Sequence, residues 1–138
     1  AWEAANDPSP AGWRVPTYAE LRTLLDTDKV TNEWTTLNGI TGRKFTDKAT
    51  GASIFLPAAG YRYGSYGTLD LAGTLGVYWS STQDYSTGGA YYLCFHSNSA
   101  DTSYYIEIEN DEVGSYGVDT YYGNPRNYGF SVRCVKAE

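Results

Sequence analysis

His96 is the only histidine in the chain, and Cys94 lies two residues before it in the run AYYLCFHS, residues 90–97. A thiol and an imidazole on one strand face can bind a metal or take part in nucleophilic catalysis. A zinc site needs further ligands, however, and the second cysteine, Cys134, stands at no metal-ligand spacing. The sequence also establishes no serine or cysteine partner for the imidazole. We therefore predict no metal site and no catalytic residues, and expect that the protein is not an enzyme.

Acidic residues gather in IEIENDE, residues 106–112, which contains Glu107, Glu109, Asp111 and Glu112. Carboxylate oxygens are the ligands that Ca²⁺ prefers, but the run does not match the spacing of an EF-hand loop, which needs a glycine at the sixth position and a glutamate at the twelfth. We interpret it as a solvated acidic stretch. The sequence predicts no cofactor, and leaves Ca²⁺ as an open alternative.

The strand that carries Cys94 and His96 determines which way these side chains point. By the two-residue period of a strand, Tyr91, Leu93 and Phe95 share one face, which leaves Tyr92, Cys94 and His96 on the other. We expect the first set to pack in the core. The second set would then face water, where tyrosine, thiol and imidazole side chains are available for contact with a ligand.

Tyrosine is the unusual component of the composition, with 14 residues in 138. Ten of them lie between Tyr78 and Tyr128, and no lysine occurs from Ala49 to Val135. Tyrosine combines a large contact area with few side-chain torsions, and binding loops mix it with Ser, Gly and Asn. We predict one domain over residues 1–138, in which 1–76 form a scaffold half and 77–135 a ligand-binding half.

The net charge of −6 restricts the classes of partner that this domain can bind. A negative surface repels phosphate backbones and anionic lipids, so we predict neither nucleic acid nor membrane as a partner. No stretch approaches the length of about 20 apolar residues that spans a bilayer. No basic-then-apolar signal segment opens the chain, and an exported protein would have lost its signal.

The elements expected around this region are mixed. Thr17 and Glu20 form a capping box, which predicts a helix that buries Leu21 and Leu24. We also predict a second helix over residues 31–37, and a hairpin over 44–60 around the turn DKATG. Further strands are expected over GVYWSST (76–82), with Trp79 in the core, over AYYLCFHS, and over GFSVRCVK (129–136).

Five motifs together resemble a known family. NDPSPAGWRVPTYAEL, FLPAAGYR, GVYWSST, AYYLCF and GFSVRCVK follow one another along nearly the whole chain. They are similar to the Fibrobacter succinogenes major paralogous domain, which occurs in surface and secreted proteins of gut bacteria. The resemblance implies an α+β, C-type-lectin-like fold with two helices packed on antiparallel strands and a long Tyr-rich loop region. It also implies an extracellular or cell-surface location.

Within that family, the chain resembles the variable proteins of diversity-generating retroelements. There, adenines in Asn codons are replaced, which can yield Tyr, Ser, Asp, Gly, His, Cys or Thr, but never Lys, Glu, Gln, Met or Trp. The resemblance implies a receptor or adhesin that binds an unidentified protein or glycan. The residue types and positions predict these variable, ligand-binding residues: Asp84, Tyr85, Tyr92, Cys94, His96, Tyr104, Tyr105, Asp119, Tyr121, Tyr122, Asn127 and Tyr128.

Two departures from the family pattern and two alternative functions stay open. Glu107, Glu109 and Glu112 lie outside the accessible set, so this stretch is either constant scaffold or was not diversified. The family commonly has a cysteine where this chain has Ser9, which leaves a bridge between Cys94 and Cys134 undecided. The alternative function is a surface adhesin or spacer domain without diversification. Oxidase chemistry at the two cysteines, by analogy with formylglycine-generating enzymes, is a weaker alternative because fold does not imply function.

Overall fold

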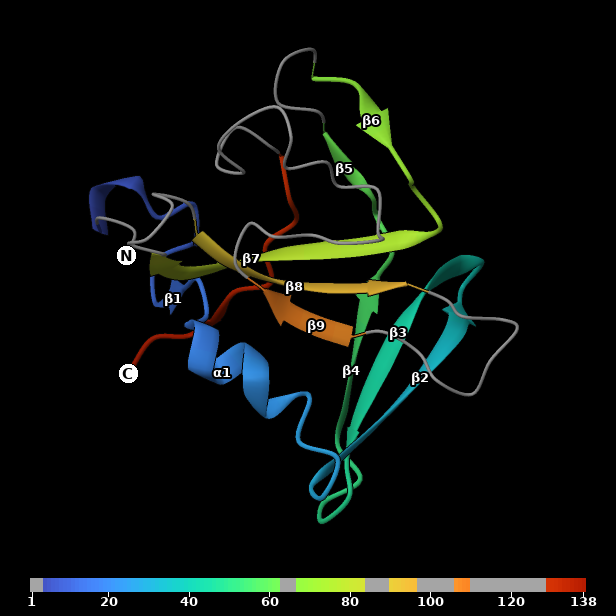
Figure 1. Cartoon of the computed structure of the whole chain (residues 1–138). Coiled ribbons are helices and arrows are strands. Elements are labelled where there is room, and N and C mark those ends of the chain that lie inside the picture. Colours follow the sequence, from blue (N-terminus) through green and yellow to red (C-terminus); the bar gives the residue numbers. More distant parts are fainter. Residues whose placement is uncertain (1–3, 63–66, 84–89, 97–105, 110–128) are drawn as a thin grey trace.

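The computed structural model describes residues 4–62, 67–83, 90–96, 106–109 and 129–138 (Figure 1). A short 3₁₀ helix occupies Ala4–Asn6, and the α-helix, α1, occupies Tyr18–Thr23. The strands are β1 Trp13–Arg14, β2 Val30–Leu37, β3 Ile40–Asp47, β4 Ser53–Pro57, β5 Tyr61–Arg62, β6 Leu69–Asp70, β7 Leu75–Gln83, β8 Ala90–His96, β9 Ile106–Glu109 and β10 Val135–Lys136.

This architecture corrects the predicted fold class. Strands make up most of the described residues, and their α-helical content is the six residues of α1. The expected α+β fold with two helices on antiparallel strands is therefore wrong for the described part of the chain. Most of the described chain forms antiparallel strands, and α1 is packed against β7 and β8 (Figure 1).

The predicted first helix is confirmed together with its cap. The Thr17 hydroxyl accepts a hydrogen bond from the Glu20 backbone N–H at 3.2 Å, and the Glu20 carboxylate accepts one from the Thr17 N–H at 2.8 Å. These two bonds satisfy backbone donors that the first turn of a helix leaves without partners. Leu21 is buried on the inner side of the helix, as predicted.

The predicted second helix over residues 31–37 is a strand instead. β2 pairs with β3 in an antiparallel hairpin whose last pair is Leu37 and Ile40. Asn38 and Gly39 join the two strands with positive φ angles of 51° and 80°. A two-residue turn of this kind matches the twist of the flanking strands, and Asn-Gly is its preferred sequence. The turn and the Thr residues of β2 therefore favour a hairpin over a helix.

Two three-stranded antiparallel sheets form most of the fold. One has the order β2-β3-β4 and the other β7-β8-β9, while β1 pairs with β10 and β5 with β6. In Figure 1 the sheet β7-β8-β9 crosses the molecule, and β2-β3-β4 descends beside it. The predicted hairpin is confirmed as β3 and β4, and the predicted strand over 76–82 lies within β7, with Trp79 buried.

The predicted last strand is shorter than expected. Only Val135–Lys136 forms a strand, β10, and its partner is β1. Upstream, Ser131 makes an isolated parallel bridge to Tyr78, and Gly129 an antiparallel one to Arg62. The C-terminal segment therefore crosses the edge of β7 before it reaches β1.

Buried side chains cover both faces of β7 and β8. We call one set the first core cluster: Tyr61, Leu75, Val77, Trp79, Tyr92, Cys94 and Phe130. The second core cluster contains Leu21, Phe45, Leu56, Ala58, Tyr78, Leu93 and Phe95. Successive residues of β8 thus alternate between two cores. Gly76 allows this packing, because a Cβ there would overlap the ring of Phe95.

No helix among the described residues is long and apolar enough to cross a membrane.

Candidate ligand-binding surface

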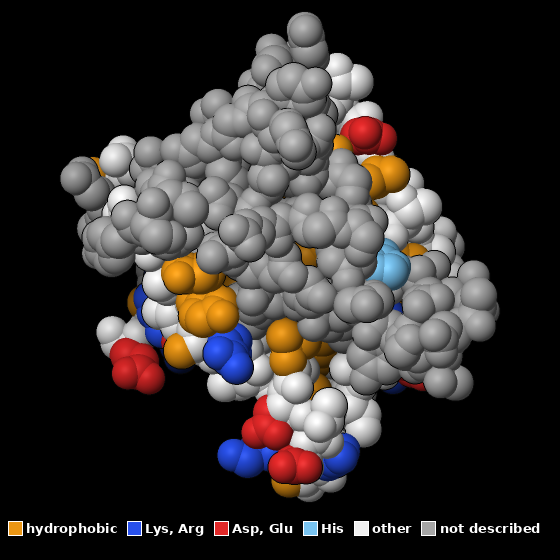
Figure 2. Space-filling view, viewed as in Figure 1, with side chains coloured by type: hydrophobic (Ala, Val, Ile, Leu, Met, Phe, Trp, Pro, Cys, Tyr) orange, Lys and Arg blue, Asp and Glu red, His pale blue; other side chains and the backbone are white. Residues whose placement is uncertain are grey.

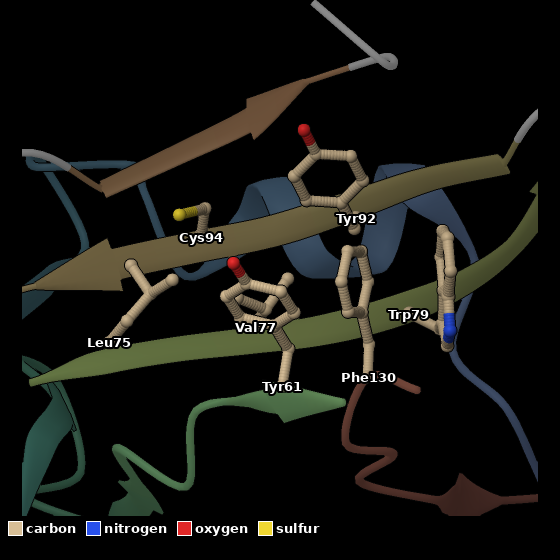
Figure 3. Close-up of a cluster of buried hydrophobic side chains, with 7 residues drawn as sticks. All are labelled: Tyr61, Leu75, Val77, Trp79, Tyr92, Cys94 and Phe130. Atoms are coloured by element: carbon tan, nitrogen blue, oxygen red, sulfur yellow. The ribbon is translucent and has the colours of Figure 1, made fainter. Parts of the chain in front are cut away.

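The face of β8 that was predicted to meet water is largely buried. Tyr92 is 0% exposed and Cys94 is 3% exposed. Figure 3 shows both within the first core cluster, where the Tyr92 ring lies 5.2 Å from the ring of Phe130 and 5.9 Å from that of Trp79. The expectation that Tyr92 and Cys94 face outward is wrong, because the C-terminal segment and β5 cover this side of the sheet.

His96 is the part of the predicted face that reaches solvent. It ends β8, pairs with Leu75 of β7, and is half-buried. The residue is partly exposed, whereas the Nε2 atom of its imidazole is buried. Only the exposed part of this side chain can contact a ligand without opening the core.

The remaining nine predicted site residues lie outside the described residues. They belong to the stretches 84–89, 97–105 and 110–128, which the chain enters and leaves at the ends of β7, β8 and β9 and at Gly129. These residues are Asp84, Tyr85, Tyr104, Tyr105, Asp119, Tyr121, Tyr122, Asn127 and Tyr128.

Arg43 holds the end of β8 against the neighbouring sheet. It is 2% exposed, and it donates hydrogen bonds to the Asn32 side-chain oxygen at 2.8 Å and to the His96 backbone carbonyl at 2.9 Å. Its guanidinium also lies 5.9 Å from the centroid of the Trp34 ring. A buried charge is costly unless hydrogen bonds compensate it. Arg43 therefore has to keep these contacts, and its bond to the His96 carbonyl holds the end of β8 in place.

Sequence reasoning missed Arg43, although a signal exists. Arg43 and Phe45 are two residues apart on β3, and therefore share the face that Phe45 turns to the core. A charged residue on a core face is an exception that requires a structural or functional reason. The reason here is structural, because Arg43 donates a hydrogen bond to the backbone carbonyl of His96, the last residue of β8.

The other side chains that could bind a metal or react, those of cysteine, aspartate and glutamate, do not form a cluster among the described residues. Cys94 and Cys134 are not joined by a disulfide. Within the described ranges, no three His, Cys, Asp or Glu side chains lie close enough together to hold a metal ion. Glu107 and Glu109 belong to β9, whereas Asp111 and Glu112 lie outside the described residues.

Charged side chains gather at the end of the molecule formed by the β3–β4 turn (Figure 2). They surround an open basin of about 740 Å³ to which Asp26, Asp28, Lys29, Asp47 and Lys48 contribute. Hydrogen bonds from the turn, first from the backbone of Ala49, lower the pKa of Asp47. Both signs of charge are interspersed here, so the basin offers no single charge to a ligand.

Comparison with known proteins gives one match. The family model described as the Fibrobacter succinogenes major domain matches residues 1–136, which is nearly the whole chain. No curated protein and no solved structure matches the chain.

Proposed function

The chain belongs to the Fibrobacter succinogenes major domain family, and we propose that it is a ligand-binding variable protein of a diversity-generating retroelement. In this proposal the described strands, except for His96 at the end of β8, form a constant scaffold. The stretches between the strand ends carry the diversified side chains that bind a protein or glycan ligand. The protein meets that ligand at the cell surface or outside the cell.

The observation that carries the proposal is where the candidate residues fall relative to the sheet β7-β8-β9. Nine of the twelve lie in the stretches that start or finish at its strand ends or at Gly129, and His96 lies at the end of β8. Binding residues of many proteins are held in this way, on connections between the elements of a rigid scaffold. Variation at such positions leaves the hydrogen-bonded strands unchanged.

Composition gives the second line of support. Tyr, Ser, Asp, Asn, Gly and Thr dominate residues 84–89, 97–105 and 110–128. These are residue types that adenine substitution in Asn codons produces, and they are also suited to recognition, because rigid aromatic rings anchor a ligand while small polar groups adapt to it. Glu107 and Glu109, which the mechanism cannot produce, lie on β9. Glu112, which it also cannot produce, lies in the stretch 110–128 and is a constant position in this proposal.

Burial narrows the set of ligand-binding residues. Tyr92 and Cys94 pack in the first core cluster, so a polar substitution at either would leave a polar group in an apolar core. We therefore assign both to the scaffold in this proposal. The ligand-binding set becomes His96 and the nine residues of the three stretches.

Sequencing the locus from many cells of the source population tests the proposal. We expect substitutions at adenines of the codons for the ten ligand-binding residues, with constant codons for β7, for residues 90–95 of β8 and for Gly129–Val135, and a nearby template copy of the segment. An unvarying locus without a template copy would refute the diversified function. It would favour the alternative, a surface adhesin or spacer domain with one fixed ligand.

A binding experiment tests the residues themselves once a ligand is identified. Alanine at Tyr104, Tyr105, Tyr121 and Tyr122 should weaken binding by more than about tenfold each where the ring is a central anchor. Trp13, an aromatic residue on β1 that is 50% exposed, provides the matched control. Unchanged binding in all four variants would show that the ligand is held elsewhere.

A further inference from the structure

A groove lies between α1, β4, β7 and the C-terminal segment, and we call it the helix groove. Its volume is about 240 Å³. Its apolar lining includes Leu21, Leu24, Ile54, Leu56, Tyr78 and Val135. Leu21, Leu56 and Tyr78 are buried, whereas Ile54 is 36% exposed. The groove therefore has an apolar floor and is open to solvent beside Ile54.

Three polar side chains in the lining, those of Glu20, Thr23 and Tyr78, are already engaged in internal contacts. The Thr23 hydroxyl donates to the Glu20 backbone carbonyl at 2.6 Å. The Glu20 carboxylate accepts hydrogen bonds from Arg14 at 2.6 and 2.8 Å and from the Thr17 N–H at 2.8 Å. The Tyr78 hydroxyl donates to the Pro57 carbonyl at 2.8 Å. A ligand in the groove would have to break these bonds in order to use any of the three groups, which makes all three poor anchors.

Arg133 is the exception. Its side chain lines the helix groove, is exposed, and forms no ion pair with any residue that the structure describes. Its charge also acts inside the groove. Burial raises the pKa of Tyr78 to about 12, and the nearby positive charge of Arg133 opposes this rise. The groove thus combines an apolar floor with one available guanidinium group.

We propose that the helix groove binds a small aliphatic carboxylate, with its hydrocarbon chain on Leu21, Leu24 and Leu56 and its carboxylate on Arg133. This site goes beyond the proposed function and does not depend on it. The guanidinium group matches a carboxylate with two parallel hydrogen bonds. A single positive charge matches a monoanion, while the adjacent Glu20 carboxylate disfavours a doubly charged phosphate.

Size restricts the ligand further. Pockets for drug-sized ligands measure about 300–1,000 Å³, and the helix groove is smaller than this range. A chain of about eight carbons supplies apolar contact without exceeding such a volume. For a ligand of that size we expect a dissociation constant on the order of 0.1–1 mM.

Isothermal titration calorimetry with sodium octanoate, below the concentration at which it forms micelles, tests this inference. We expect saturable binding at one site, and weaker binding of the uncharged probe 1-octanol. Arg133→Gln should weaken octanoate binding by about 10- to 100-fold, because a charge-assisted hydrogen-bonding partner is lost. Lys136→Gln is the matched control, since Lys136 is an exposed cation of the same segment that does not line the groove.

A second variant tests the location independently of the charge. Ile54→Trp places a larger side chain at the open side of the groove, on an exposed strand position that tolerates an aromatic residue. It should abolish octanoate binding while circular dichroism and urea denaturation stay close to those of the parent. The inference is overturned if octanoate does not bind, if 1-octanol binds as tightly, or if Arg133→Gln or Ile54→Trp leaves octanoate affinity unchanged.

Discussion

Replacing Arg43 by methionine should be among the most destabilising single changes in the fold. Methionine keeps much of the aliphatic volume but removes the donors to the Asn32 side chain and the His96 carbonyl. Each hydrogen bond from a charged group contributes about 1.5–3 kcal/mol, and both acceptors belong to partly buried residues. We expect a loss of about 3–5 kcal/mol in the free energy of unfolding, which is a large part of the 5–15 kcal/mol typical of a domain.

Urea denaturation followed by tryptophan fluorescence measures this loss. With a slope of about 1–3 kcal/mol per molar urea, the Arg43→Met midpoint should fall by at least 1 M. Arg43→Lys should lie between this variant and the parent, because an ammonium group cannot reproduce the planar fork of donors.

Lys44→Met is the matched control for this series. Lys44 is the next residue of β3, on the opposite face, and its loss should change stability by less than about 0.5 kcal/mol. The reasoning is refuted if Arg43→Met unfolds at the same urea concentration as the parent, or if Lys44→Met costs as much.

Three further predictions concern stability and use the same urea assay. The hydrogen bond from Arg14 lowers the pKa of Glu20 from 4.5 to about 2. The stabilisation from the ionised carboxylate is therefore complete above pH 4.5 and is lost as the pH falls toward 2. Glu20→Gln should remove this pH dependence of the free energy of unfolding, which amounts to less than about 1 kcal/mol because the ion pair is partly exposed. Gly76→Ala should cost about 1–3 kcal/mol through overlap with the Phe95 ring, and Phe95→Leu should recover part of it; equal stability of parent and Gly76→Ala would contradict the packing. Tyr78→Phe should cost about 1–2 kcal/mol, because the partly buried carbonyl of Pro57 loses its donor, and an unchanged midpoint would show that water replaces the hydroxyl.

Local signals in the sequence predicted several elements correctly, because a few neighbouring residues determine each of them. The capping box at Thr17 and Glu20 predicts where α1 begins, and DKATG predicts the β3–β4 turn. A buried strand around Trp79 follows from its run of large side chains. In each case the element is determined by interactions between residues close together in sequence, or the residue types of the segment favour only one kind of element.

The second helix failed for a related reason. Trp34 and Leu37 are three residues apart, which is a helical spacing, but the stronger signal is the dipeptide Asn38–Gly39 directly after them. Its positive φ angles close a hairpin, and this lets β2 pair along its whole length with β3. A short apolar spacing is weak support for a helix when a hairpin turn follows it.

The error at β8 has a different origin, because the side chains that cover its second face come from segments distant in sequence. Alternation predicts an inner and an outer face only where one face of a sheet meets water. Tyr92, Leu93, Cys94 and Phe95 are all apolar or aromatic, which is typical of a strand buried on both sides. Which segments cover the second side depends on contacts with Tyr61 and residues near Phe130, which are distant in sequence.

The burial of Tyr92 and Cys94 restricts the positions at which this fold could carry variable residues. If variable residues alternated with core residues along β8, every new side chain on one face would have to fit the first core cluster, where Trp79 and Phe130 enclose Tyr92. A close-packed core tolerates few such changes. A strand buried on both faces instead fixes the points where the chain leaves the sheet, and Arg43 fixes one of them at the carbonyl of His96. Variation that begins at His96 is therefore compatible with a stable scaffold, whereas variation at the buried Tyr92 is not.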